Sequence, residues 1–279
     1  MDYRCVREFN QNVGDIRFVA IFERRRAFRD SYTLPFNTLI AILEDGGDEV
    51  SLVENQLTHE VRPYRRYDLL FTPVWLSVLY TSFESLRLIA LHFNLFRYPG
   101  MDVYNGCRDW IYGHDPAFVR RIETAFRTEE PLRSLTALRA CCLDFCARHW
   151  PETEQADSAE LTKMRPVIDW IEAHADARTG IPELAGRLSM SPVVFSRKFK
   201  SLFGESPKKY LEKTLVNRAI ALLANSDCKV KDAAGTLGFS SEYYFSNFFR
   251  RMVGMYPLEY KKQQLQQGKR IGQQDNVGE

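Results

Sequence analysis

The sequence of 279 residues contains no run of 18 or more apolar residues, so no membrane span is predicted. The first residues, MDYRCVREFNQ, lack the apolar core of a signal peptide, and a cytoplasmic protein is therefore expected. The six cysteines include no CxxC pair and have no histidine at zinc-finger spacing. With 45% hydrophobic and 27% charged residues, the composition is that of a globular protein and excludes a disordered chain.

Histidine is also scarce, with five in the whole chain and none closer than 22 residues to the next. They are His59, His92, His114, His149 and His174. His59 and His92 could meet across a barrel, but a metal site of the cupin type needs closely spaced histidines with a glutamate. We expect no metal, no cofactor and no enzyme, because no Ser-His-Asp, Cys-His or phosphate-loop arrangement is present either.

Two of the cysteines, Cys142 and Cys146, stand four residues apart in a predicted helix and share one face. They could form a redox pair or half of a metal site. Burial as small hydrophobic residues is the alternative, because free cysteine is among the most buried residue types.

Positive charge is unevenly distributed, and no lysine precedes Lys163. Residues 1–159 carry 19 arginines against 23 acidic residues, whereas residues 160–270 carry 19 basic and 11 acidic residues. The net charges are therefore −4 and +8. A basic segment joined to an acidic one is typical of a nucleic-acid module with a separate partner domain, although a solvated basic face is the simpler alternative.

The first 110 or so residues have the pattern of β structure. Strand-like runs cover residues 38–43, 49–53, 58–61, 69–73, 76–81 and 86–96. Turn signals such as Asp45-Gly46-Gly47 separate them. In the last run, Leu88, Ala90, His92 and Asn94 share one face, and Ile89, Leu91, Phe93 and Leu95 share the other. Short strands at this spacing predict a barrel or a sandwich.

Helical periodicity begins at Asp115-Pro116, which has the pattern of a helix N-terminus. A second helix is predicted over residues 132–149, with an apolar stripe at alternating spacings of three and four. The stripe consists of Leu135, Leu138, Cys142, Phe145 and His149. It either packs on its own barrel or forms a dimer seam through Leu135, Leu138, Cys142 and Phe145. Residues 151–159 are polar and acidic, as in a linker.

The basic segment contains an internal repeat with a period of 49 to 50 residues. Ala185 corresponds to Ala234, and Phe195 and Phe199 correspond to Phe245 and Phe249. Each copy predicts a helix, a short turn and a second helix. Ser191 and Ser240 are the predicted N-caps of the second helices, and Gly204 and Gly254 the predicted left-handed ends.

The outward faces of the second helices follow from the inward-facing phenylalanines. In the first copy they are Val193, Ser196, Arg197 and Lys200; in the second they are Glu242, Tyr243, Ser246, Asn247, Arg250 and Arg251. Arg197 can bind guanine and Asn247 adenine in bidentate fashion, and Val193 can contact a thymine methyl group. Lys200, Arg250 and Arg251 suit phosphate. A solvated polar face is the alternative for each residue.

Residues 164–262 resemble the DNA-binding domain of the AraC/XylS family of transcription regulators. The second repeat carries the more specific signature, Gly238-Phe239-Ser240, Tyr244-Phe245-Ser246, Phe249-Arg250 and Gly254, with Pro257 and Tyr260. The resemblance implies two helix-turn-helix motifs joined by a long helix over residues 207–224. It also implies recognition helices in successive major grooves of double-stranded DNA.

Three positions depart from the family pattern. Leu215 stands where the linking helix usually carries arginine, Lys261 stands where arginine usually follows the tyrosine, and Tyr67 stands where glycine usually precedes the aspartate of the barrel turn. The first departure implies the loss of a contact, and the second keeps the charge.

The N-terminal half is similar, more loosely, to the cupin-like sensor barrel of such regulators. An effector pocket is expected to involve Tyr32, Trp75, Tyr80, His92 and Asn94, with core packing as the alternative for each. A small molecule such as a sugar, RNA polymerase and a second copy of the chain are the implied partners.

We therefore predict an α+β protein in which an N-terminal cupin-like β-barrel and two helices precede an all-α domain with two helix-turn-helix motifs. The expected layout is a sensing or dimerising domain over 1–150, a linker over 151–162, a DNA-binding domain over 163–265 and a tail over 266–279. The leading hypothesis is an effector-controlled transcription activator. The alternatives are a constitutive regulator whose barrel only dimerises, and a cupin-type enzyme with a DNA-targeting module.

Overall fold

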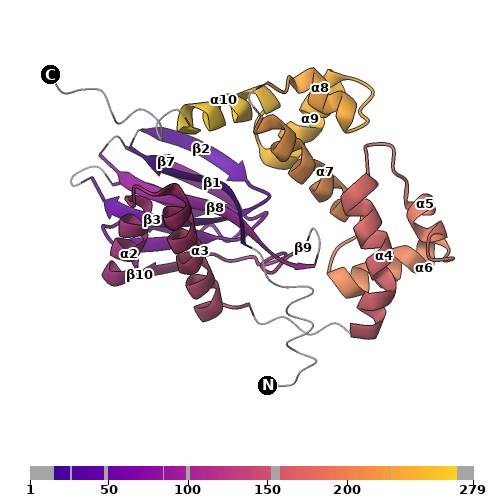
Figure 1. The fold of residues 1–279 in the computed structure, drawn as a ribbon, viewed down its shortest axis with the longest axis horizontal. Helices are drawn as coiled ribbons and strands as arrows, with labels where there is room; N and C mark the ends of the chain where they lie inside the picture. The colour runs from indigo at the N-terminus through magenta and orange to yellow at the C-terminus, as the bar shows by residue number, and fades with distance from the viewer. Residues whose placement is uncertain are drawn as a thin grey trace. The chain divides into compact units, whose positions relative to one another are not determined.

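The computed structural model describes residues 16–25, 27–46, 50–83, 85–98, 101–151, 158–225 and 227–268. Half of the predicted linker (residues 152–157), nearly all of the predicted tail, and Cys5 lie outside these residues. The last five residues of the predicted linker, 158–162, are not linker but the start of a helix. The chain divides into two compact units between Pro151 and Glu152 (Figure 1). None of the described helices is long and apolar enough to cross a membrane.

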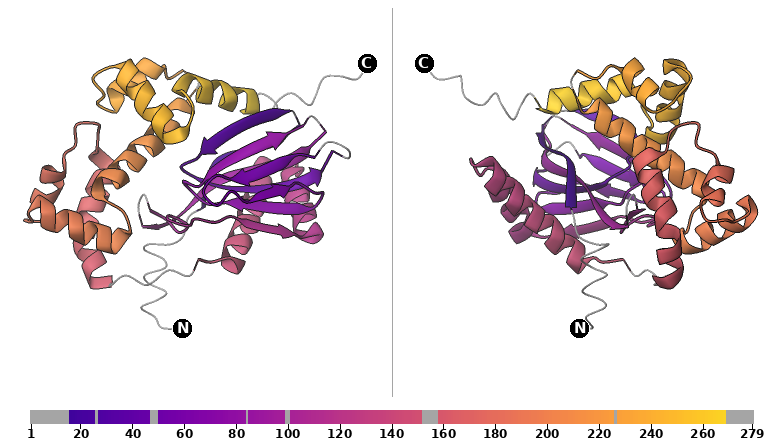
Figure 2. Two further views of the ribbon diagram at one scale, coloured as in Figure 1. Left: turned by 180° about the vertical axis from the view of Figure 1, so that it is seen from behind. Right: turned by 45° about the vertical axis from the view of Figure 1, so that its right-hand side comes forward.

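The N-terminal unit contains two antiparallel sheets, one above the other (Figure 2). The larger follows the order β1 (Ile16–Arg24), β8 (Arg87–Tyr98), β3 (Asn37–Glu44), β6 (Asp68–Thr72) and β10 (Ile111–His114), and β9 (Met101–Asp102) pairs with β8. The smaller follows the order β2 (Phe28–Thr33), β7 (Ser77–Ser82), β4 (Leu52–Asn55) and β5 (Val61–Pro63). The predicted α+β class is confirmed, with the difference that the described strands leave both sheets open and do not close into one ring.

Four of the six predicted strand runs coincide with strands to within two residues, and two are displaced. The strand predicted over 49–53 begins only at Leu52. The run over 58–61 is displaced because Thr58 lies in a turn and its strand begins only at Val61. Strands β1, β2, β9 and β10 had no specific prediction. The sequence of β1, IRFVAIFER, does not alternate strictly between apolar and polar residues, and β2 is mostly polar. Neither therefore shows the period of two that marks a half-buried strand.

Two helices cover one face of the larger sheet, α2 (Pro116–Phe126) and α3 (Pro131–Arg148). Asp115 caps α2 as predicted, because its carboxylate accepts a hydrogen bond from the Phe118 amide at 2.9 Å. The face of β8 that carries Ile89, Leu91, Phe93 and Leu95 belongs to the same buried cluster as these helices. The prediction of two different faces for β8 is thus confirmed: one face packs against the helices, and the other points to the opposite side of the sheet.

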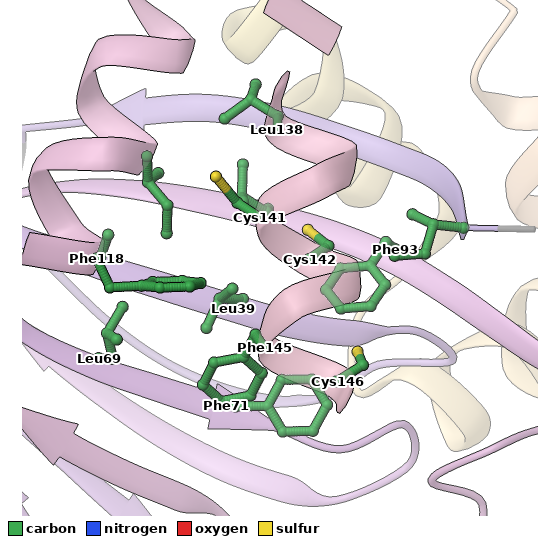
Figure 3. Close-up of a cluster of buried hydrophobic side chains, with 14 of the residues drawn as sticks. Leu39, Leu69, Phe71, Phe93, Phe118, Leu138, Cys141, Cys142, Phe145 and Cys146 are labelled. Atoms are coloured by element: carbon green, nitrogen blue, oxygen red, sulfur yellow. The ribbon is translucent and has the colours of Figure 1, made fainter. Parts of the chain in front are cut away.

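The middle three residues of the predicted stripe of α3 point into this cluster (Figure 3), whereas its two ends, Leu135 and His149, are exposed. Leu138, Cys142 and Phe145 are 1%, 0% and 4% exposed, whereas Leu135 is 42% exposed. The stripe therefore packs on its own unit, and these three side chains cannot form a dimer seam while the unit is folded. Two heptads of spacing show that a helix has an apolar face but not which neighbour covers it.

The cysteines of α3 are part of the same core. Cys141, Cys142 and Cys146 are at most 2% exposed, and their thiols are free. Burial raises the pKa of Cys146 to about 12 and that of Cys142 well above its usual range. A thiol that stays protonated is a poor redox nucleophile, so the packing interpretation is favoured over a redox pair.

One arginine joins the larger sheet to α2. Arg87 lies 2.5 Å from Glu23, 2.9 Å from Glu44 and 3.3 Å from Glu123, so β1, β3 and α2 meet at its guanidinium. Arg127 adds a second cation beside Glu23 at 2.7 Å. Hydrogen bonds to three carboxylates use the planar donor pattern that distinguishes arginine from lysine.

All regular secondary structure in the described part of the C-terminal unit is helical. Its helices are α4 (Ser158–His174), α5 (Ile181–Gly186), α6 (Pro192–Phe203), α7 (Pro207–Leu223), α8 (Val230–Thr236), α9 (Glu242–Val253) and α10 (Pro257–Gly268). Figure 1 shows α7 running between the group of α4 to α6 and the group of α8 to α10. The long linking helix predicted over residues 207–224 is confirmed to within one residue.

Candidate nucleic-acid interface

The first helix-turn-helix motif consists of α5 and α6. Ser191 caps α6, and its hydroxyl accepts a hydrogen bond from the Val194 amide at 3.4 Å. Phe195 and Phe199 are fully buried, and their ring centroids lie 5.6 Å apart. Gly204 ends the helix at φ +73°, a left-handed conformation that glycine adopts without steric cost. These four features are as predicted.

The second helix-turn-helix motif, α8 and α9, repeats this arrangement with one correction. Phe245 and Phe249 are fully buried, and Gly254 ends α9 at φ +91°. The N-cap is Ser241 rather than Ser240, because the Ser241 hydroxyl accepts the hydrogen bond from the Tyr244 amide at 3.3 Å. Both serines suit a cap, and the sequence alone placed it one residue too early.

The ten predicted DNA-facing side chains lie on α6 and α9. Eight are exposed: Val193, Arg197, Lys200, Glu242, Tyr243, Asn247, Arg250 and Arg251. Ser196 and Ser246 are half-buried. Val193 and Tyr243 are large apolar or aromatic side chains with 76% and 71% of their surface exposed. Exposed hydrophobic side chains on a helix with cationic neighbours are suited to base edges and methyl groups.

The charged groups of these faces differ in how they are held. Among the described residues, no ion pair engages the Arg197 guanidinium or the Lys200 ammonium. Arg250 donates to the Tyr256 hydroxyl at 2.7 Å and lies 4.7 Å from the centre of its ring. Arg251 lies 3.0 Å from Glu212 on α7. Its guanidinium must therefore leave this carboxylate, or contact it and a phosphate at once, when the chain binds DNA.

Three residues beside the predicted faces were missed. Tyr244 is 62% exposed on α9 next to Tyr243, Tyr256 holds Arg250, and Glu212 holds Arg251. Tyr244 and Tyr256 both belong to the signature segment between Phe239 and Pro257, and that position was the available signal. Nothing in the local sequence points from Glu212 to Arg251, because their contact joins residues 39 apart.

The linking helix α7 is fixed by buried polar contacts. Lys213 and Glu205 pair at 2.7 Å, with 8% and 9% of their side chains exposed. Glu172 of α4 accepts hydrogen bonds from the hydroxyls of Tyr210 at 3.2 Å and Thr214 at 2.9 Å. Breaking a buried pair of this kind is costly because it leaves a desolvated charge, so these contacts stabilise the packing of α7.

The departures from the family pattern have local explanations in two cases. Leu215 is 5% exposed and packs in the core of the C-terminal unit, so it replaces a charged contact by apolar burial. Lys261 keeps the charge, and its ammonium donates to the backbone carbonyl of Cys228. The positive φ of Tyr67, +69°, explains why glycine suits that position.

The predicted effector residues of the N-terminal unit divide between two places. Tyr32, Tyr80 and His92 are buried between the sheets, where the Tyr80 hydroxyl lies 3.3 Å from the Thr72 hydroxyl across the gap. The rings of Tyr32 and Tyr80 are 6.0 Å apart. Trp75 packs instead against the cluster on the helix side of the larger sheet. This tryptophan lies in a turn and has φ +66°, so strand alternation does not predict its direction.

His92 and the fifth predicted residue, Asn94, both lie on β8 and differ in their hydrogen bonding. Asn94 donates to the Pro35 carbonyl at 3.1 Å. His92 lies 4.7 Å from the Phe36 ring and 5.0 Å from the Phe22 ring, and its Nδ1 has no hydrogen-bond partner among the described residues. Burial, and to a lesser extent the charge of Arg24, lowers the pKa of His92 to about 3, so the imidazole is neutral.

His59 does not join His92. Its side chain is 80% exposed and lies 3.5 Å from Glu54. Among the described residues, no cluster of three histidine, cysteine or acidic side chains could hold a metal ion.

The sequence of the C-terminal unit matches known proteins. Residues 184–263 match the family described as helix-turn-helix domain. The transcriptional activator Btr of Bacillus subtilis is 32% identical over 118 residues, which cover 42% of this chain and 21% of Btr. The transcriptional activator RhaS of Escherichia fergusonii is 29% identical over 108 residues, which cover 39% of each chain. The chain thus spans well under half the length of these two relatives.

The fold of the whole chain matches solved structures of ToxT from Vibrio cholerae. The apo form of a ToxT variant has a TM-score of 0.61 and 13% identity, with 90% of this chain and 98% of that chain covered. Wild-type ToxT bound to an unsaturated fatty acid has a TM-score of 0.58 at the same identity, with 90% and 96% covered. At this identity the likeness concerns the fold alone.

Proposed function

The C-terminal unit belongs to the AraC-type helix-turn-helix domains, and on that premise we propose that the chain is a sequence-specific transcription activator controlled by a small-molecule effector. The observation that carries the DNA-binding part is the pair of exposed, chemically different faces on α6 and α9. Arg197 and Lys200 give the first face two cations, whereas the second face adds an acid and an amide, Glu242 and Asn247, to the cations Arg250 and Arg251. Because the two recognition helices of one chain carry different side chains, the DNA site they bind must be asymmetric.

The roles of individual side chains follow from their chemistry. We assign Arg197 to guanine, Asn247 to adenine and Glu242 to the amino group of cytosine, since these pairs match donors to acceptors in the major groove. Val193 contacts a thymine methyl group. Lys200 and Arg250 contact phosphate, which positions the motifs without reading sequence.

The separateness of the DNA-binding unit has a direct test. A fragment lacking residues 1–159 should fold, remain monomeric and bind the same DNA sequence as the full chain, as measured by circular dichroism, light scattering and gel shift. An unfolded fragment would contradict the boundary, and a folded fragment without sequence preference would contradict the DNA-binding assignment.

For the N-terminal unit we propose that the space between the two sheets holds the effector. Two polar atoms there support this site, because the His92 Nδ1 and the Tyr64 hydroxyl are buried without a hydrogen-bond partner in the described protein. Buried polar groups are nearly always paired in native proteins, so these two are suited to a ligand. Burial, and then the neighbouring Tyr80, raises the pKa of Tyr64, which keeps its hydroxyl a donor.

A thermal-shift screen of sugars, carboxylic acids and other metabolites tests the effector site. A ligand at 100 times its dissociation constant stabilises the native state by about 2.7 kcal/mol. His92→Leu should abolish the shift, while the control His174→Leu, on the exposed end of α4, should retain it. A regulator whose N-terminal unit only dimerises would show no shift with any compound, and stoichiometric bound metal would favour the enzyme alternative.

We propose that the chain forms a homodimer through the outer face of α3. Leu132 and Leu143 are 73% and 40% exposed, and Leu135 adds a further exposed side chain to this face. Trp150, just beyond the helix, is 45% exposed. Leu143→Glu should convert a dimer to a monomer in light scattering, whereas the control Leu57→Glu, in an exposed turn, should not. A dimer that survives Leu143→Glu would exclude this face.

A contact with RNA polymerase is part of the activator proposal. Purified chain should raise transcription from a promoter next to its selected site in a reconstituted reaction. A lower transcript level would assign the chain to repression and leave the DNA-binding part intact.

A further inference from the structure

The loop between α4 and α5, residues 175–180, contacts the turn of the second helix-turn-helix motif. The Ala177 amide donates to the Leu237 carbonyl at 2.8 Å. The next residue of that turn, Gly238, has φ +73°, and a Cβ there would lie 2.7 Å from the Asp176 carboxylate. The loop and the turn therefore lie so close together that only glycine, which has no side chain, fits at position 238 without a shift.

Asp176 is held rigidly at this contact. Its carboxylate accepts hydrogen bonds from the Arg178 amide at 2.8 Å and from the Arg178 Nε at 2.9 Å. Its own amide donates to the Thr179 hydroxyl at 3.0 Å. A carboxylate fixed by charge-assisted hydrogen bonds is a firm steric stop rather than a mobile surface side chain.

The same loop is attached to the linking helix and to the first motif. Arg218 of α7 donates to the Ala175 carbonyl, and Gly180 leads directly into α5 at Ile181. Residues 175–180 thus touch three parts of the C-terminal unit: the first motif through the chain itself, α7 through Arg218, and the second motif through Leu237 and Gly238. Without this loop, α7 and the helices packed on it would alone fix one motif relative to the other.

The geometry points to a positioning role: we infer that the loop 175–180, seated on Gly238, sets the distance and angle between α6 and α9 and so determines which spacing of two DNA contacts the chain accepts. This inference rests on the proposed DNA binding. One base pair changes the position of a contact by about 3.4 Å along the duplex and by about 34° around it. A firm connection between the motifs penalises such a change, and a loose one tolerates it.

The test starts from a DNA site selected from random duplexes by the full chain. Duplexes with one base pair added or removed between the two contacted segments are then compared with the selected site. For the unaltered protein, we expect each change to weaken binding at least about tenfold, comparable to a mismatched base pair. Asp176→Ala should reduce this penalty to about threefold or less while leaving the affinity for the selected site within about threefold.

Two further variants make the result specific. Asp169→Ala removes the same charge from the exposed side of α4 and should keep the full spacing penalty. Gly238→Ala pushes the loop away and should lower the penalty as Asp176→Ala does, with the fold checked by circular dichroism. If Gly238→Ala does not fold, Asp176→Ala alone decides the question.

The outcomes separate the two proposals. An unchanged spacing penalty in folded Asp176→Ala overturns the positioning role, as does an equal loss of affinity on all duplexes, which a purely structural role would produce. If the unaltered chain selects no DNA sequence, the proposed DNA binding itself fails, and the positioning role fails with it.

Discussion

The first and second helix-turn-helix motifs are alike where they face inward and different where they face outward. Each buries two phenylalanines one helical turn apart, is capped by a serine and ends in a left-handed glycine. Their exposed faces share one cation, since Lys200 and Arg250 stand at equivalent positions. They differ elsewhere, because Arg197 is matched by Asn247 and the second face adds Glu242. The inward residues thus specify the same fold twice, and the outward residues are free to specify two different halves of one DNA site.

The largest expected effect tests the inward likeness. Phe199→Ala and Phe249→Ala should each lower the free energy of unfolding by about 3–5 kcal/mol, because each removes a fully buried ring. Native-state hydrogen exchange of the full chain would measure the loss motif by motif. Tyr243→Ala, at an exposed position, should change stability by less than about 0.5 kcal/mol. A large difference in stability loss between the two phenylalanine variants would contradict the equivalence of the two buried cores.

The next effect tests the outward difference. Arg197→Ala and Asn247→Ala should each cost about 1–3 kcal/mol of binding and relax the preference at one base pair, at two different positions of the site. Competition binding against single-base variants of the selected site measures both. Arg165→Ala, which removes one positive charge from α4, is the control for Arg197→Ala. Equal loss on specific and random DNA would show that Arg197 contacts phosphate instead.

A smaller effect separates the cations by how they are held. Lys200→Ala should weaken binding equally on all sequences and lower the slope of log affinity against log salt by about 1. Arg251→Ala should change that slope less, because Glu212 already engages this guanidinium. Titrations at several salt concentrations give both slopes, and equal changes would mean that the ion pair opens on DNA.

The smallest effect concerns the caps. Ser191→Ala and Ser241→Ala should each cost about 1 kcal/mol of stability. Ser240→Ala should cost almost nothing, because its hydroxyl does not cap α9. Hydrogen exchange at the first turns of α6 and α9 distinguishes the three variants. A larger loss for Ser240→Ala than for Ser241→Ala would contradict the observed cap.

The sequence predicted the C-terminal unit more closely than the N-terminal one, for physical reasons. Ser191 is followed by proline, which leaves one place for the helix to start, whereas Ser240 and Ser241 both qualify as caps and only the backbone decides between them. Helix periodicity and glycine ends are local signals. Contacts such as that of Arg251 with Glu212 depend on packing and are not local.

In the N-terminal unit the predictions depended on which neighbour covers a face. The spacing of Leu138, Cys142 and Phe145 defined a face correctly, but only the structure shows that the larger sheet covers it. Alternation placed His92 correctly in β8, while Trp75, at a positive φ within a turn, lies on the other side of the sheet. Strand alternation predicts direction only within a regular strand.

The most direct test of the central claim is selection of binding sites from random duplex DNA by the full chain, followed by sequencing. We expect one enriched, asymmetric site with two unlike contacted segments about 34–36 Å apart, one helical turn. The segment read by α6 should lose its preference in Arg197→Ala, and the segment read by α9 should lose its preference in Asn247→Ala. An absence of any enriched sequence would contradict the account, as would two identical segments that respond to both substitutions alike.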